Sequence, residues 1–182
     1  MAWNIDRRLA WGIGIAFAGI ALALAATVLP KREVHYALGV NVFHCQIRAD
    51  ASLCTAWASL SVGNTGNVDQ DLVRVHLPAG AADWRFSARV FDIRASVAPR
   101  PIPKIRHRPE GPVIVYEITP LPENTVVDFD GQCLQCPEET IRAMAPDRIR
   151  VEATGRVAEG DPRVTTILRG LMNVLLALVP AS

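Results

Sequence analysis

The chain reads LSVGNTGNVDQDLVRVHLP at residues 60–78, and this stretch decides the fold class. Asn-Thr-Gly-Asn at positions 64–67 is a turn signal. After the turn, apolar side chains alternate with polar ones over residues 73–78. A period of two places apolar side chains on one face and polar side chains on the other, as in a half-buried β-strand. The stretch therefore predicts a strand, a turn and a second strand.

Similar alternation runs upstream, from residue 34 to residue 62. The first run has an apolar face made of Val34, Tyr36, Leu38, Val40 and Val42. The apolar phase shifts by one residue at Phe43, which predicts a β-bulge. The second run has an apolar face made of Cys54, Ala56, Ala58, Leu60 and Val62. If a tight turn joins the two runs, Cys45 and Cys54 lie opposite each other within disulfide reach.

Further strands are predicted at residues 84–95, 113–118, 125–129 and 148–153. One short helix is predicted over residues 137–144, with Pro137 at its first position and two glutamates matching the helix dipole. About seven short strands joined by turns that contain Pro and Gly indicate a mainly β fold. We therefore expect an antiparallel immunoglobulin-like β-sandwich.

The N-terminal stretch over residues 9–29 contains no charged residue. As a helix it would reach about 30 Å, enough to cross a bilayer. We therefore expect a cytoplasmic stub and transmembrane anchor at residues 1–30, an extracytoplasmic β-sandwich at 31–162 and a C-terminal amphipathic helix at 163–182. The alternative is a signal peptide whose cleavage would release a secreted protein, because Arg7 and Arg8 precede the apolar run.

The strand, Asn-x-Gly-Asn turn and following strand of residues 60–78 resemble those of bacterial immunoglobulin-like modules of the CARDB type. The resemblance implies a role in adhesion, assembly or display, and it carries no catalytic residues to this chain. The sequence departs from that pattern by an insertion with C-x-x-C and a helix. Together with the anchor, the resemblance implies a single-pass protein of the bacterial inner membrane with a periplasmic domain.

The four cysteines form two close pairs, Cys45 with Cys54 and Cys133 with Cys136. Behind an export segment such pairs indicate disulfide bonds made in an oxidising compartment. An alternative follows from Cys133 and Cys136, because C-x-x-C before a helix is typical of thiol-disulfide oxidoreductases. The βαβ context of such enzymes is missing from the sequence pattern. A zinc site is a further alternative, although the spacing between Cys45 and Cys54 does not suit a zinc knuckle.

The charge is almost balanced, with 19 basic and 18 acidic side chains, so no global field favours nucleic acid. Residues 85–108 are strongly basic, and the next thirty residues carry the acidic side chains. Such blocks pair most often across neighbouring strands. The alternative is a basic loop over residues 99–112 that contacts anionic lipid or an acidic partner. Its contact residues would be Arg100, Lys104, Arg106 and Arg108.

Residues 164–179 predict a helix with a narrow polar stripe through Thr166, Arg169 and Asn173. The helix is too short to span a bilayer. It either closes one end of the sandwich or lies on the membrane or on a partner's transmembrane helix, with Arg169 snorkelling.

These observations predict a non-enzymatic, membrane-anchored binding or assembly module, an accessory component of an envelope or membrane complex. Its expected partners are membrane lipid through residues 9–29 and a protein of the membrane or envelope. We expect no catalytic residue, no metal, no cofactor, no nucleic acid and no small-molecule substrate. The alternative is a membrane-tethered thiol-disulfide oxidoreductase that uses Cys133 and Cys136.

Overall fold

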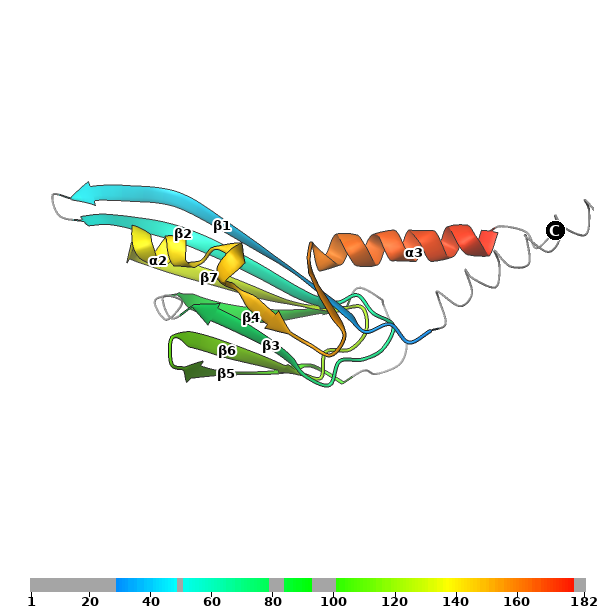
Figure 1. Ribbon diagram of the computed structural model, residues 1–182. Helices are drawn as coiled ribbons and strands as arrows, with labels where there is room; N and C mark the ends of the chain where they lie inside the picture. Colours follow the sequence, from blue (N-terminus) through cyan, green and yellow to red (C-terminus); the bar gives the residue numbers. More distant parts are fainter. Residues whose placement is uncertain (1–28, 49–50, 79–83, 93–100, 179–182) are drawn as a thin grey trace, which may run out of the picture. The chain divides into compact units, whose positions relative to one another are not determined.

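The computed structural model describes residues 29–48, 51–78, 84–92 and 101–178, in which nine strands form two sheets (Figure 1). The first sheet has the order β4 (Arg85–Asp92), β7 (Thr125–Pro137), β2 (Ala51–Asn64), β1 (Glu33–Arg48) and β9 (Arg156–Glu159). The second sheet has the order β5 (Lys104–Glu110), β6 (Val113–Thr119), β3 (Val73–Pro78) and β8 (Arg150–Glu152). The expected mainly β sandwich is confirmed.

Residues 60–78 carry the chain from one sheet to the other, because β2 lies in the first sheet and β3 in the second. The buried side chain of Asn64 fixes this crossing. Its amide nitrogen donates to the carbonyl oxygens of Val68 (2.9 Å) and Leu121 (3.0 Å), and its Oδ1 accepts from the N–H of Gly66 (3.0 Å). The buried side-chain amide of Asn64 therefore has hydrogen-bond partners at both its nitrogen and its oxygen, as burial requires.

The core lies between the two sheets and follows the predicted alternation. The apolar face of β2 and the inward residues of β3 are fully buried at Ala58, Leu60, Val62, Val73, Val75 and Leu77. Tyr116 of β6 meets Phe129 of β7 in an edge-to-face contact with ring centroids 5.1 Å apart. Such aromatic pairs add to the free energy gained by burial of their apolar area.

Strands β1 and β2 form the predicted hairpin. Their register shifts between Val42 and His44, which confirms the β-bulge, and Cys45 lies opposite Cys54 with their Cα atoms 4.0 Å apart. The two cysteines form the predicted disulfide bond. On its other edge β1 pairs with β9 in parallel, and only over Glu33–Tyr36.

Three local predictions differ from the structure. Residues 125–129 are only the start of β7, which continues to Pro137, so the C-x-x-C sequence lies in a strand. Pro137 occupies the N-cap position of α2 (Glu138–Ala143), one residue before the first helical position that was predicted for it. The alternative of a basic loop is wrong for Lys104–Glu110, which form β5, because β6 offers this segment a full ladder of antiparallel pairs.

Two further helical elements complete the described chain: a short 3₁₀ turn, η2 (Pro146–Arg148), and a longer C-terminal helix, α3 (Pro162–Leu178). Within the described ranges no helix is long and apolar enough to cross a membrane. The predicted transmembrane segment lies outside those ranges except for its last residue, Leu29.

Candidate binding surface on helix α3

The polar side of α3 faces the sandwich. Thr166 is buried, and its hydroxyl donates to the carbonyl of Pro162 one turn earlier (2.8 Å). The guanidinium of Arg169 donates to the carbonyl oxygen of Thr65, in the loop after β2. The Thr166 bond lies within α3, whereas the Arg169 bond joins the helix to the domain. A polar contact therefore holds α3 where a surface helix usually rests on its apolar face.

The first turn of α3 is held by a buried carboxylate on the outer face of the first sheet. Asp128 of β7 forms an ion pair with Arg163 and accepts a hydrogen bond from the hydroxyl of Ser61 on β2 (2.6 Å). The guanidinium of Arg163 also lies 5.5 Å from the ring centroid of Phe91, a cation–π distance. Three strands thus contribute to one anchor for the start of the helix.

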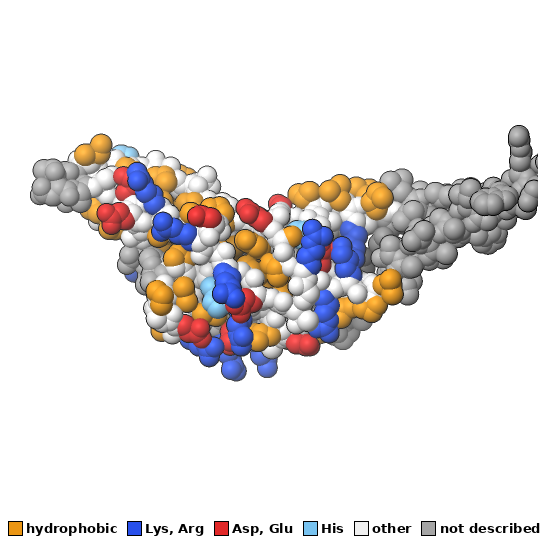
Figure 2. Space-filling model, in the orientation of Figure 1, with side chains coloured by type: hydrophobic (Ala, Val, Ile, Leu, Met, Phe, Trp, Pro, Cys, Tyr) orange, Lys and Arg blue, Asp and Glu red, His pale blue; other side chains and the backbone are white. Residues whose placement is uncertain are grey.

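The opposite side of α3 is apolar and exposed. Five large hydrophobic side chains share this face and are each 52–57% exposed: Val164, Ile167, Leu168, Leu171 and Met172. Their spacing of three, four, seven and eight residues is that of a single helix face. Figure 2 shows the hydrophobic side chains gathered in a row along α3. We name these five residues the α3 apolar face. A contiguous exposed apolar surface of this kind marks an interaction site.

Among the sequence-predicted contact residues, Arg169 lies on the anchoring side of α3, where it binds Thr65. Its contact with lipid or a partner stays a prediction. Sequence reasoning missed Ser61, Asp128 and Arg163. The available signal was an acidic residue inside the apolar run at residues 125–129, on the face opposite the core.

The one acidic residue of β6, Glu117, lies among the basic residues of β5, as the charge blocks predict. Arg106 is the register partner of Glu117, and Arg108 lies 3.5 Å from the same carboxylate. Lys104 and Arg106 line a shallow pocket of about 190 Å³ with Glu117 and Thr119. Exposed ion pairs of this kind contribute little to stability. Arg100 lies outside the described residues, and contact of these side chains with lipid or a partner stays a prediction.

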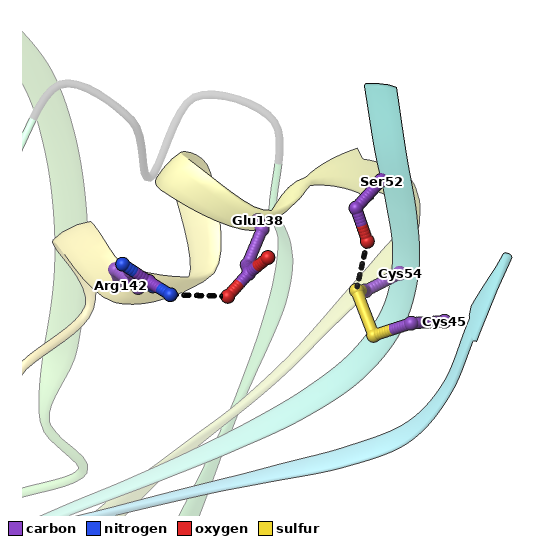
Figure 3. The surroundings of a disulfide bond; sticks show 5 residues. All are labelled: Cys45, Ser52, Cys54, Glu138 and Arg142. Atoms are coloured by element: carbon purple, nitrogen blue, oxygen red, sulfur yellow. Dashed lines mark hydrogen bonds and ion pairs between the residues drawn. A yellow bond between two sulfur atoms is a disulfide. The ribbon is translucent and has the colours of Figure 1, made fainter. Parts of the chain in front are cut away.

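Both cysteine pairs form disulfide bonds. Figure 3 shows Cys45–Cys54 joining β1 to β2, with the hydroxyl of Ser52 at 3.8 Å from the sulfur of Cys54. The other pair, Cys133 and Cys136, is buried. Thiol-disulfide exchange needs a sulfur that an attacking thiolate can reach, so this burial does not favour an oxidoreductase. Among the described residues no group of three His, Cys, Asp or Glu side chains could hold a metal ion.

Two titratable groups lie next to the loop that receives Arg169. His35 Nδ1 lies 2.7 Å from the hydroxyl of Thr65, and burial lowers the pKa of His35. Burial alone would raise the pKa of Glu33, but the hydrogen bond and charge of Lys31, with further positive charge nearby, lower it overall. Both shifts favour the folded state near neutral pH.

No model of a known protein family and no curated protein matches this sequence. Among solved structures, the chain is similar to the family 3a carbohydrate-binding module from the cipA scaffolding of Clostridium thermocellum. The TM-score is 0.32 with 14% identity, over 68% of this chain and 99% of the module. It is also similar to a CBM3 of Hungateiclostridium clariflavum, with a TM-score of 0.32 and 12% identity, over 68% of this chain and 95% of that one. The resemblance of residues 60–78 to CARDB modules stays a prediction, and what the structure shows is a β-sandwich fold.

Proposed function

We propose that this protein is a membrane-anchored, extracytoplasmic binding or assembly module, an accessory component of a membrane complex. The observation that carries the proposal is the α3 apolar face, which points away from the domain while the polar side of the helix is bonded to it. A helix arranged in this way has its docking surface outward.

The size of the exposed surface supports a docking role. Burying the exposed half of five large apolar side chains contributes on the order of 5 kcal/mol. That is comparable with the whole free energy of unfolding of many domains. A surface of this size in water promotes association with any apolar phase, so we propose that α3 is covered in the working protein.

The charge distribution along α3 favours lipid as the covering phase. The two charged residues of the helix, Arg163 and Arg169, are both held by the domain, and residues 170–179 contain no charge. The helix can therefore lie at a membrane interface without immersing an unpaired charge. The uncharged stretch at residues 9–29 supplies an anchor to the same membrane in this proposal.

The disulfide bonds support an oxidising compartment. We therefore propose that the domain lies on the periplasmic side of a bacterial inner membrane. The alternative of a secreted protein predicts a different behaviour in membrane extraction, because cleavage of the N-terminal segment would remove the anchor. Alkaline extraction of isolated membranes tests this point: the anchored protein stays in the pellet, and a protein without its anchor enters the supernatant.

Affinity purification in mild detergent tests the assembly role. Tagged wild type is compared with Leu168→Glu/Leu171→Glu, which places two charges on the α3 apolar face, and with Leu134→Glu, an exposed apolar position on β7. We expect wild type and Leu134→Glu to co-purify the same membrane proteins. The double variant should co-purify less of them, because α3 no longer holds the domain against the bilayer in which those proteins lie. Wild-type protein that migrates as a lone polypeptide at its own mass would contradict an accessory role.

A further inference from the structure

The sheet edges of this sandwich are protected unequally. In the described chain β4 carries Arg85, Arg89 and Asp92, and β5 carries three basic residues and a proline. The edge strands β8 and β9 have three and four residues. Charges, prolines and short length are the devices by which proteins prevent edge strands from pairing with other chains.

One edge lacks charges and prolines and is protected only by a β-bulge. Strand β9 covers β1 only as far as Tyr36, and in the described structure no strand pairs with the rest of that edge. Residues 37–47 read ALGVNVFHCQI, without Lys, Arg, Asp, Glu or Pro. The bulge after Val42 interrupts the regular strand. The regular open edge therefore consists of residues 37–42, which we name the open β1 edge.

The direction of the backbone groups on this edge follows from its pairing with β9. The carbonyl oxygen of Tyr36 accepts a hydrogen bond from the N–H of Gly160, just beyond β9. Because alternate residues of a strand direct their N–H and C=O groups to the same side, those of Leu38, Val40 and Val42 also face outward. Their side chains belong to the apolar face of β1, and Val42 is 52% exposed.

We propose that the open β1 edge pairs with the same edge of a second copy of this chain, antiparallel and about a two-fold axis at Val40. In this register Val40 lies opposite Val40 of the second copy, and Leu38 lies opposite Val42. The outward N–H and C=O groups of one copy then form hydrogen bonds with those of the other copy. The first sheet of each copy thereby joins that of its partner in one continuous sheet.

Self-pairing suits this edge because it is self-complementary. Antiparallel pairing about a residue places side chains of the same face opposite each other, so the apolar row of one copy meets the apolar row of the other. No charge lies opposite a like charge, since residues 37–42 carry none. The two-fold arrangement also closes on itself and ends at two copies.

Cysteine cross-linking of the full chain in mild detergent tests the register. Val40 pairs would be hydrogen-bonded, with Cα atoms about 5.5 Å apart, within the range that a disulfide spans. We expect Val40→Cys to give a covalent dimer under mild oxidation. The matched control is Ala88→Cys, an exposed position on the protected edge strand β4, which stays monomeric. Equal cross-linking of the two variants would overturn the proposal.

A second variant tests the backbone bonds directly. Val42→Pro removes an N–H that faces outward, a change that an edge strand tolerates, whereas Val42→Thr keeps the donor. We expect the dimer dissociation constant, from light scattering, to rise at least roughly tenfold for Val42→Pro and to change little for Val42→Thr. A monomeric mass for wild type at every concentration reached would overturn the proposal. If Val42→Pro fails to fold, the cross-linking of Val40→Cys decides between a dimer and a monomer.

Discussion

Helices α2 and α3 both pack on the β-sandwich, but they turn opposite sides to it. In α2, Ile141 is buried in the core, and the ion pair between Glu138 and Arg142 is exposed (Figure 3). In α3, the ionic and hydrogen-bonding side chains lie against the domain, and the apolar side chains are exposed. Helix α2 therefore contributes to the hydrophobic core, whereas α3 exposes its apolar face to the surroundings of the domain. Amphipathicity alone therefore does not tell which side of a helix a domain will hold.

The largest expected difference between the two helices is in how much an alanine substitution lowers the free energy of unfolding. Ile141→Ala should lower the free energy of unfolding by about 3 kcal/mol, because it leaves a cavity in the core. Leu168→Ala should change it by less than about 0.5 kcal/mol, because the side chain is exposed. Urea unfolding of the two variants in the same detergent measures both values. Equal losses would mean that the α3 apolar face packs on the domain after all.

The contacts of Asp128 that hold the first turn of α3 should give the next largest effect on the free energy of unfolding. Asp128→Ala leaves the buried hydroxyl of Ser61 without its acceptor and Arg163 without its ion pair. We expect a loss of about 2 kcal/mol and faster hydrogen exchange in the first turns of α3, with α2 unchanged.

The matched control for this anchor is Asp130→Ala on the same strand, because Asp130 pairs with the exposed Arg89 and not with α3. Its cost should be below about 1 kcal/mol, as for other exposed ion pairs. Slow exchange of the α3 amides in Asp128→Ala would show that other contacts hold the helix.

The smallest expected effect is a dependence on pH. The folded state lowers the pKa of His35 below 6.5, so its contribution to stability is complete above that value and is lost as the pH falls. We expect hydrogen exchange in α3 to accelerate relative to α2 between about pH 7 and pH 5, because His35 contacts Thr65, which receives Arg169. In His35→Gln the ratio of the two exchange rates should stay constant. A wild-type ratio that does not change with pH would count against this link.

Much of the fold could be predicted from alternation, which identified the β1–β2 hairpin, its bulge, its disulfide and β3. Strand β5 was not predicted, because an exposed edge strand such as KIRHRPE has no apolar face. The end of β7 was missed because Cys133 to Cys136 interrupt the period of two. Periodicity also indicated a C-terminal helix with two unlike sides. Which side the domain holds depends on Thr65 and Asp128, which are distant in sequence, so local pattern could not decide it.

Accessibility of a spin label in lipid tests the central claim most directly. Full-length protein in lipid vesicles carries a nitroxide at Leu168→Cys on α3 or at Glu139→Cys, an exposed position on α2. We predict that the label at position 168 is reached by oxygen dissolved in the bilayer and protected from a water-soluble nickel complex, and that the label at position 139 shows the reverse. If both labels are equally accessible to the nickel complex, the α3 apolar face does not lie on the membrane.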